Sequence, residues 1–157
     1  MKRYSWKYMA GLVDGEGCID MQSSIDKRDG RRYCRPRFRM TLSGLPGKIM
    51  IPVFIANFGG TWDGIKERQW DNKNWKIPYA WCLTGKQHLR PFLQNIVNHL
   101  VIKKEQAKFA IWWIDNLMGK KVYKEVKRFG IDELKAMKID PHRLSERAIE
   151  KIKVMLD

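Results

Sequence analysis

A short segment near the start of the chain joins small residues to acids. Residues 9–17 read M-A-G-L-V-D-G-E-G, so an apolar stretch ends in Asp14 and Glu16 with one glycine between them. Gly11 and Gly15 lie four positions apart and therefore share one face of a helix. Small residues at this spacing let two helix backbones approach closely.

Two copies of this helix in contact would bring two acidic groups together at one end of the contact. Carboxylate oxygens are ligands that Mg²⁺ prefers in proteins. The segment therefore predicts a divalent-metal site shared between two chains. The alternative is that Ala10, Gly11 and Gly15 only pack against the sheet of their own chain, but this leaves the acids at positions 14 and 16 unexplained.

The residues after this segment change from a helical period to strict alternation. Ser5 is the predicted N-cap of a helix that ends at Gly15 and Gly17. Residues 18–25 and 35–43 then alternate apolar and polar side chains, as half-buried strands do. A charged turn joins these two strands.

The same order returns in the second half of the chain. A helical segment runs through residues 49–58, with Pro52 within or near its first turn. Two further strands follow at about residues 61–70 and 75–84. Amphipathic helices are then predicted around residues 89–97, 105–118, 131–137 and 145–156, the last with Ser145 as its N-cap.

This order of elements predicts an α+β fold with one antiparallel four-stranded sheet and helices on one face. Residues 1–118 are the predicted core domain, and residues 119–157 a C-terminal helical extension packed on it.

The charge of the chain points to a polyanionic partner. Lys and Arg number 31 against 17 Asp and Glu, a net charge of +14. A basic protein of the ribosome surface is the alternative that charge alone leaves open. Three cysteines and three histidines show no metal-ligand spacing, and no apolar run reaches the ~20 residues of a membrane span. We therefore expect a soluble intracellular protein of the cytoplasm or nucleoid, or of an organelle if organelle-encoded.

Three arginines mark one face of the predicted sheet. Arg35, Arg37 and Arg39 alternate along one strand, so their side chains emerge on the same side. Without matching acids these charges repel one another, which favours a surface that binds nucleic acid. A two-stranded ribbon fits the major groove of B-DNA. The predicted DNA-binding residues are Asp20, Gln22, Ser24, Arg28, Arg35, Arg37, Arg39, Thr41, Lys66, Arg68 and Lys76.

The segment at residues 9–17 closely resembles the signature of the LAGLIDADG homing endonucleases, and the predicted α-ββ-α-ββ-α order is similar to their core over about residues 6–118. The resemblance implies a saddle-shaped DNA-binding sheet and an intron-encoded, site-specific endonuclease. Because the motif occurs once, it implies a homodimer on a long pseudo-palindromic double-stranded DNA site. Mg²⁺-dependent hydrolysis of one phosphodiester per strand across the minor groove would leave short 3′ overhangs; Mn²⁺ or Ca²⁺ would substitute for binding.

The resemblance also implies roles for single residues. Glu16 takes the position of the metal-binding acid, and the Gly15 carbonyl helps to hold the metal. The family's basic residue precedes a Q-A stretch, here I-K-K-E-Q-A at residues 102–107, so Lys103 is the catalytic candidate and Lys104 the fallback. The dimer interface would comprise Ala10, Gly11, Asp14 and Gly15.

One position departs from the family's pattern. Many members carry a Gln at the end of the second strand, close to the attacking water, whereas this chain offers only Ser43 or Thr41 there. Ser43 is the catalytic candidate at this position.

Two other functions use the same fold. An intron RNA maturase would bind RNA, and the basic residues 120–128 could serve that purpose. A DNA-binding regulator that has lost cleavage is disfavoured because Glu16 is intact.

Overall fold

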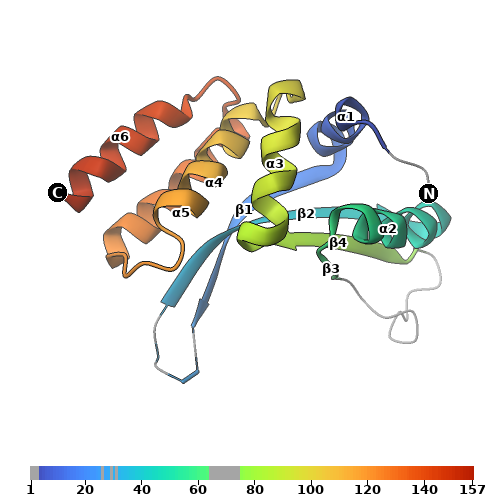
Figure 1. The fold of residues 1–157 in the computed structure, drawn as a ribbon, viewed down its shortest axis with the longest axis horizontal. Helices are drawn as coiled ribbons and strands as arrows, with labels where there is room; N and C mark the ends of the chain where they lie inside the picture. The colour runs from blue at the N-terminus through green and yellow to red at the C-terminus, as the bar shows by residue number, and fades with distance from the viewer. Residues whose placement is uncertain (1–3, 26, 29, 31, 64–74) are drawn as a thin grey trace.

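A computed structural model describes residues 4–25, 27, 28, 30, 32–63 and 75–157. Its centre is an antiparallel sheet in the order β1-β2-β4-β3. The strands are β1 (Gly17–Ile25), β2 (Arg32–Ser43), β3 (Thr61–Trp62) and β4 (Pro78–Thr84). Figure 1 shows the hairpin of β1 and β2 projecting beyond the rest of the molecule.

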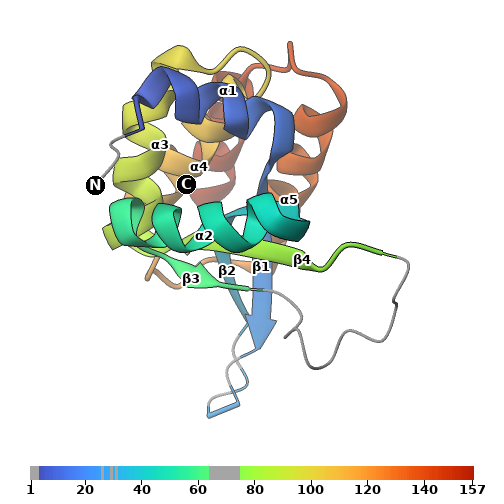
Figure 2. The ribbon, with the colours of Figure 1, turned by 90° about the vertical axis from the view of Figure 1, so that its right-hand side faces the viewer.

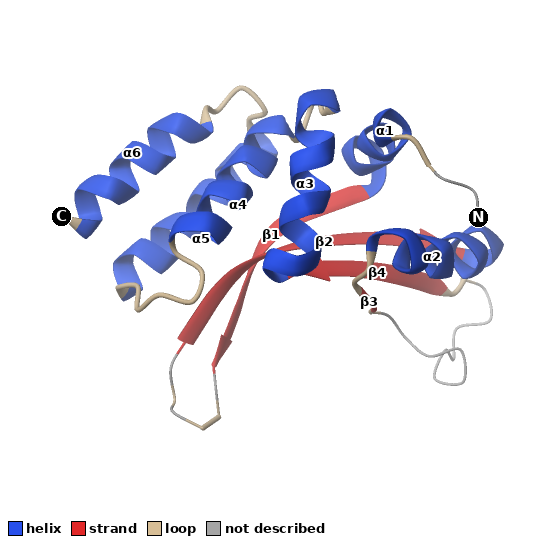
Figure 3. Ribbon diagram, in the orientation of Figure 1, coloured by secondary structure: helices blue, strands red, loops and turns tan. Residues whose placement is uncertain are grey.

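The helices gather on one side of this sheet, as Figures 2 and 3 show. They are α1 (Trp6–Glu16), α2 (Gly44–Phe58), η2 (Gly85–Leu89), α3 (Arg90–Ile96), η3 (Val97–His99), α4 (Lys104–Asn116), α5 (Lys124–Ile139) and α6 (Ser145–Leu156). The predicted α+β architecture is confirmed. None of the described helices is long and apolar enough to cross a membrane.

The core lies between the sheet and the helices and is rich in aromatic side chains. Ile19, Phe38 and Trp81 from neighbouring strands are fully buried. The rings of Phe38 and Trp81 meet edge to face with centroids 5.4 Å apart, a geometry that aromatic quadrupoles favour. The ring of Phe92 on α3 lies 5.3 Å from that of Trp81 and ties the helical layer to the sheet.

The start of α2 differs from its predicted position. Gly44 adopts φ +70°, which turns the chain directly from β2 into the helix, and its N–H donates to Ile77 O at 2.8 Å. The helix therefore begins at Gly44, and Pro46 occupies its first turn. Pro52 lies in the helix interior, so its predicted place in or near the first turn was wrong.

Two later predictions also need correction. α5 begins at Lys124, well before the predicted residue 131. Ser145 is the first residue of α6, and Leu144 occupies the N-cap position. The N–H and the hydroxyl of Ser145 both donate to Glu105 Oε2, at 2.9 and 2.7 Å. This contact ties α6 to α4.

The second pair of strands is shorter than predicted in the described residues. β3 ends at Trp62 and β4 begins at Pro78. Most of the predicted strand at residues 61–70 lies outside the described residues. The division of the chain after residue 118 stays a prediction.

Candidate active site and nucleic-acid interface

Two faces of α1 differ in what they contact. Met9, Ala10 and Val13 are fully buried against the core of their own chain. A Cβ placed on Gly11 or Gly15 would meet no described atom within 4 Å, so this face packs against nothing in the described part of the chain. The alternative that the glycines serve packing against their own sheet therefore fails.

Ala10 does not belong with the glycines. The helix turns by about 100° per residue, which places Ala10 on the core face, where it has no exposed area. Its predicted place in a dimer interface stays a prediction. Gly11 and Gly15 remain on the open face.

The helix ends on Glu16, the candidate metal ligand. Glu16 is exposed and forms no hydrogen bond or ion pair with a described residue. The next residue is Gly17, where a Cβ would lie 2.6 Å from Phe38 Cε2 and 2.8 Å from the Val13 carbonyl oxygen. Only glycine fits this close approach, which carries the chain straight from α1 into β1 and fixes where Glu16 stands.

Asp14 connects the end of α1 to the start of α4. Its carboxylate accepts the backbone N–H groups of Val101, at 2.8 Å, and Lys103, at 2.9 Å. The Lys103 ammonium in turn donates to the Asp14 carbonyl oxygen. Asp14 thus anchors Lys103 beside the helix end that carries Glu16, a role within one chain in addition to its predicted place at an interface.

Lys103 has a perturbed environment. Burial lowers the pKa of Lys103 below its ordinary value of 10.5, and the positive charge of Lys138 lowers it further, while Asp14, Cys18 and Glu16 oppose that shift. Lys103 forms two hydrogen bonds with Asp14, one from its backbone N–H and one from its ammonium. Lys104, the fallback candidate, is the next residue and begins α4. The structure therefore brings Lys103, and not Lys104, to the end of α1.

The candidates for positioning water occupy the end of β2. Gly17 pairs with Met40, so Thr41 is the next residue of β2 beyond this pair and Ser43 lies two positions further along. Ser43 precedes α2, where its side chain forms no capping hydrogen bond. Both side chains are exposed. In register, Thr41 lies nearer to Glu16 than Ser43 does.

The arginines on the outer face of the sheet have partners. Asp20 pairs with Arg37 across the hairpin and accepts from its Nε at 3.0 Å and Nη2 at 2.8 Å. Arg35 Nε donates to Gln22 Oε1 at 3.3 Å. The hydrogen bond to Asp20 raises the pKa of Arg37 above its ordinary value.

Arg39 lies next to an acid that the sequence did not single out. Its Nε lies 3.4 Å from Asp63 Oδ2, just beyond β3. The premise that the arginines lack matching acids was therefore wrong: Asp20 and Asp63 hold two of the three. A short strand that ends at Trp62 gives no pattern that predicts this pairing.

The other predicted DNA-binding residues come from separate parts of the chain. Ser24 pairs with Tyr33 near the far end of the hairpin, and Arg28 is exposed in its turn. Lys76 is exposed and lies beside Gly44 at the start of α2. Lys66 and Arg68 lie outside the described residues.

Sequence reasoning missed Lys138, which comes from the last turn of α5. Its Nζ lies 2.9 Å from Cys18 Sγ, on the strand that follows Glu16. The two residues are 120 positions apart, and no local pattern links them. With Lys103, it places a second cation at the start of β1.

The residues present suit a metal only in part. Within the described residues no group of three or more His, Cys, Asp or Glu side chains is placed to hold a metal ion. Glu16 and the Gly15 carbonyl offer the oxygen ligands that Mg²⁺ prefers. These two groups lie at the edge of the open glycine face.

Comparisons with known proteins bear on the fold. No family model and no curated protein matches the chain. Among solved structures, the homing endonuclease I-CvuI, in complex with the I-CreI target in the presence of Mg, is 19% identical with a TM-score of 0.67. That match covers 97% of this chain and 94% of I-CvuI.

Two further structures extend the comparison. The homing endonuclease I-TnaI is 19% identical with a TM-score of 0.56, over 96% of this chain and 99% of that one. The DNA-bound meganuclease I-SmaMI is 14% identical with a TM-score of 0.54, over 87% of this chain but only 44% of that one. Together with the motif at residues 9–17, these likenesses show that the chain has the fold of the LAGLIDADG homing endonucleases.

Proposed function

We propose that this protein is a site-specific homing endonuclease that acts as a homodimer on double-stranded DNA. The observation that carries the proposal is the end of α1. An open glycine face ends in Glu16, which forms no hydrogen bond or ion pair with a described residue, and Asp14 anchors Lys103 beside it. This arrangement suits a catalytic site that a second copy completes.

The dimer would form through α1. A two-fold axis beside Gly11 and Gly15 lets the two helix backbones approach closely and brings both Glu16 carboxylates together. The lengths of the similar proteins support a dimer of this single-motif chain, because the chain corresponds to a whole protein in two of the matches and to less than half of a longer one in the third. This chain matches nearly all of I-CvuI and I-TnaI, whereas it matches less than half of I-SmaMI.

DNA would lie against the outer face of the sheet. The antiparallel ribbon of β1 and β2 has the width to enter the major groove of B-DNA. An arginine has five N–H donors, and Asp20 accepts from only two of the nitrogens of Arg37. The remaining donors of Arg37 stay available for a base edge or a phosphate, while the ion pair holds the side chain in place.

Glu16 and the Gly15 carbonyl would hold Mg²⁺, with the phosphate of the DNA supplying further oxygen ligands. When bound, the metal polarises the phosphate, lowers the pKa of a water and stabilises the leaving 3′ oxygen. The Lys103 ammonium would stabilise the negative charge that develops on the phosphate. Thr41 or Ser43 would orient the attacking water through its hydroxyl.

The position of the two acids determines the cut. Because both Glu16 residues would stand close to the two-fold axis, they reach one phosphate on each strand across the minor groove. The resemblance to the family implies the same outcome, a staggered cut with short 3′ overhangs.

Substitution of Glu16 tests this function. Wild-type protein and Glu16→Gln are incubated with DNA that spans the intron-minus allele of the host gene, with Mg²⁺ or with EDTA. We expect the wild type to cut once per strand only with Mg²⁺. Glu16→Gln keeps nearly the same shape but loses the charge, so it should bind the same DNA without cutting it. A variant that still cuts would remove Glu16 from the metal site, and wild type that never cuts would contradict the function.

A further inference from the structure

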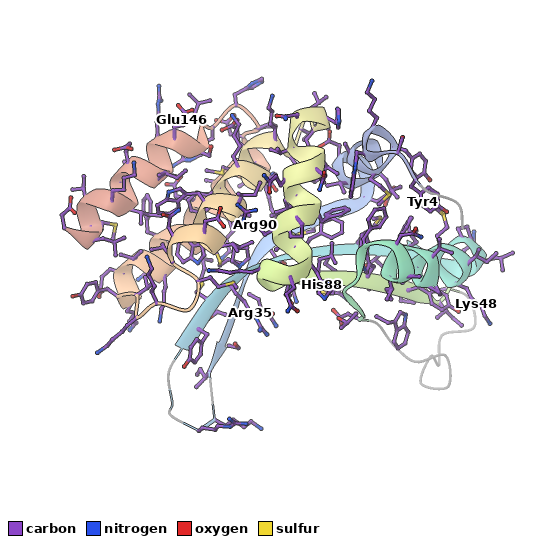
Figure 4. The ribbon with its side chains drawn as sticks, in the orientation of Figure 1. Tyr4, Arg35, Lys48, His88, Arg90 and Glu146 are labelled. Atoms are coloured by element: carbon purple, nitrogen blue, oxygen red, sulfur yellow. The ribbon has the colours of Figure 1, made fainter. Side chains whose placement is uncertain are left out.

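A basic groove lies beside the hairpin of β1 and β2. β4 pairs with β2 only from Arg37 onward, so the earlier part of β2 has no described strand on that side. The loop between α4 and α5 lies along this edge, and the two enclose a groove of about 680 Å³. Figure 4 places Arg35 at the foot of the helical layer, where the hairpin leaves the sheet.

The charge in this groove is of one sign. Among the described residues that line it, four are cations and none is an acid: Arg35, Lys120, Lys121 and Lys127. Lys120 and Lys121 are exposed, and neither forms an ion pair with a described residue. The neighbouring charges of Lys120 and Lys121 repel one another, so an anion that enters the groove beside them is stabilised there.

Two arginines elsewhere in the helical layer are paired with acids. Arg90 lies 2.6 Å from Asp115, and Arg143 lies 2.7 Å from Glu133. These pairs balance their own charge. Lys120 and Lys121 of the α4–α5 loop form no such pair with a described residue, and they lie side by side at the groove.

We propose that this groove binds the phosphate backbone of the DNA that flanks the outer part of each half-site, an inference that rests on the proposed function. The major groove is about 12 Å wide and two paired strands lie about 5 Å apart, so side chains beside the ribbon reach the phosphates that border the groove. Arg35 belongs both to the outer face of the sheet and to the groove wall. The groove therefore continues the DNA-binding face.

Contacts of this kind position the protein without reading sequence. The groove would add affinity through release of counterions and would fix the angle at which the hairpin enters the DNA. Sequence discrimination would stay with the side chains of the sheet.

The test compares two double variants that lose the same charge. Lys120→Gln with Lys121→Gln removes the loop lysines, and Arg147→Gln with Lys151→Gln removes two exposed cations on α6, beside a different pocket. Binding to a target duplex with long flanks is measured in Ca²⁺ over a range of salt concentrations. The loop variant should bind at least about tenfold more weakly at ~0.1 M salt, and its salt slope should fall by about 0.9 for each phosphate that the protein no longer neutralises.

Duplex length provides the second comparison. When the flanks are trimmed, the wild type should lose affinity, whereas the loop variant should lose little because it no longer binds the flanking phosphates. The α6 variant should behave as the wild type throughout.

Three outcomes would overturn the inference. The loop variant could bind DNA as tightly as the wild type at all salt concentrations, or both double variants could lose the same affinity for DNA. The third outcome is a loop variant that loses affinity only for intron RNA. Arg37→Ala separates this inference from the proposed function. If Arg37→Ala weakens DNA binding and the loop variant does not, the DNA-binding function stands and the groove has no part in it. If the wild type binds no DNA at all, both fall.

Discussion

The end of α1 and the outer face of the sheet differ in whether their charged side chains, Glu16 and Arg37, have partners among the described residues. Glu16 is exposed and has no hydrogen-bond or ion-pair partner among the described residues, whereas Arg37 is held by two hydrogen bonds from its own nitrogens to Asp20. On the proposed function, the helix end provides half of a cleavage site, whereas Arg37 of the sheet face has its partner within the same chain. On the proposed function, cutting requires two helix ends to meet, whereas the sheet of one chain can contact one half-site, so cutting and contact with DNA should be separable.

The largest effect should come from filling the open face of α1. Gly15→Leu meets no described atom of its own chain at the Cβ position but would hold two helix backbones apart. We expect a folded monomer that has lost cleavage entirely. Sedimentation gives the mass, and circular dichroism should show unchanged helix content because leucine favours a helix more than glycine does. A dimer that still cuts would contradict the proposed interface.

A smaller effect should come from the paired arginine on the sheet. Arg37→Ala should weaken specific binding by about 1–3 kcal/mol if the side chain bonds two acceptors of a guanine. Asp20→Asn is the matched variant: it removes a negative charge that repels DNA and should tighten non-specific binding by less than about 1 kcal/mol. Competition titrations measure both. Weaker binding in both variants would show that the ion pair acts as one unit.

The smallest effect should appear in the pH dependence of cleavage. Burial lowers the pKa of Lys103 below 10.5, so as the pH rises its ammonium loses the proton earlier than that of an ordinary lysine. The cleavage rate should therefore fall several-fold on the alkaline side. The arginine in Lys103→Arg keeps its charge at alkaline pH, so the cleavage rate of this variant should not fall there. Its maximal rate should be lower than that of the wild type. Rates are compared at saturating Mg²⁺. A wild-type rate that rises with pH would instead indicate that unprotonated Lys103 acts as a base.

Local patterns predicted the parts of the fold that local chemistry determines. Ser5 caps α1 through the N–H of Tyr8, at 3.2 Å, as expected of an N-cap serine. The alternation of residues 35–43 predicted which side chains of β2 face the core, and Phe38 and Met40 are fully buried there. The start of α2 was missed because the φ of Gly44, which decides it, leaves no periodic signal.

The partners of the site residues could not be predicted in the same way. Asp14 accepts from Val101, which is 87 positions away, and Lys138 reaches Cys18 across 120 positions. Such pairs depend on how the helices pack and not on any spacing in the chain. The Asp20–Arg37 pair spans 17 positions and follows from the hairpin register. That register depends on the turn, whose length the sequence pattern left open.

The central claim is that two copies of the chain make one cleavage site, and the number of chains on one target duplex tests it most directly. Native mass spectrometry of wild-type protein with the target duplex in Ca²⁺ counts them without cleavage. We expect two chains per duplex, and a cleaved duplex once Mg²⁺ replaces Ca²⁺. A stable complex of one chain per duplex that cuts both strands in Mg²⁺ would contradict the claim.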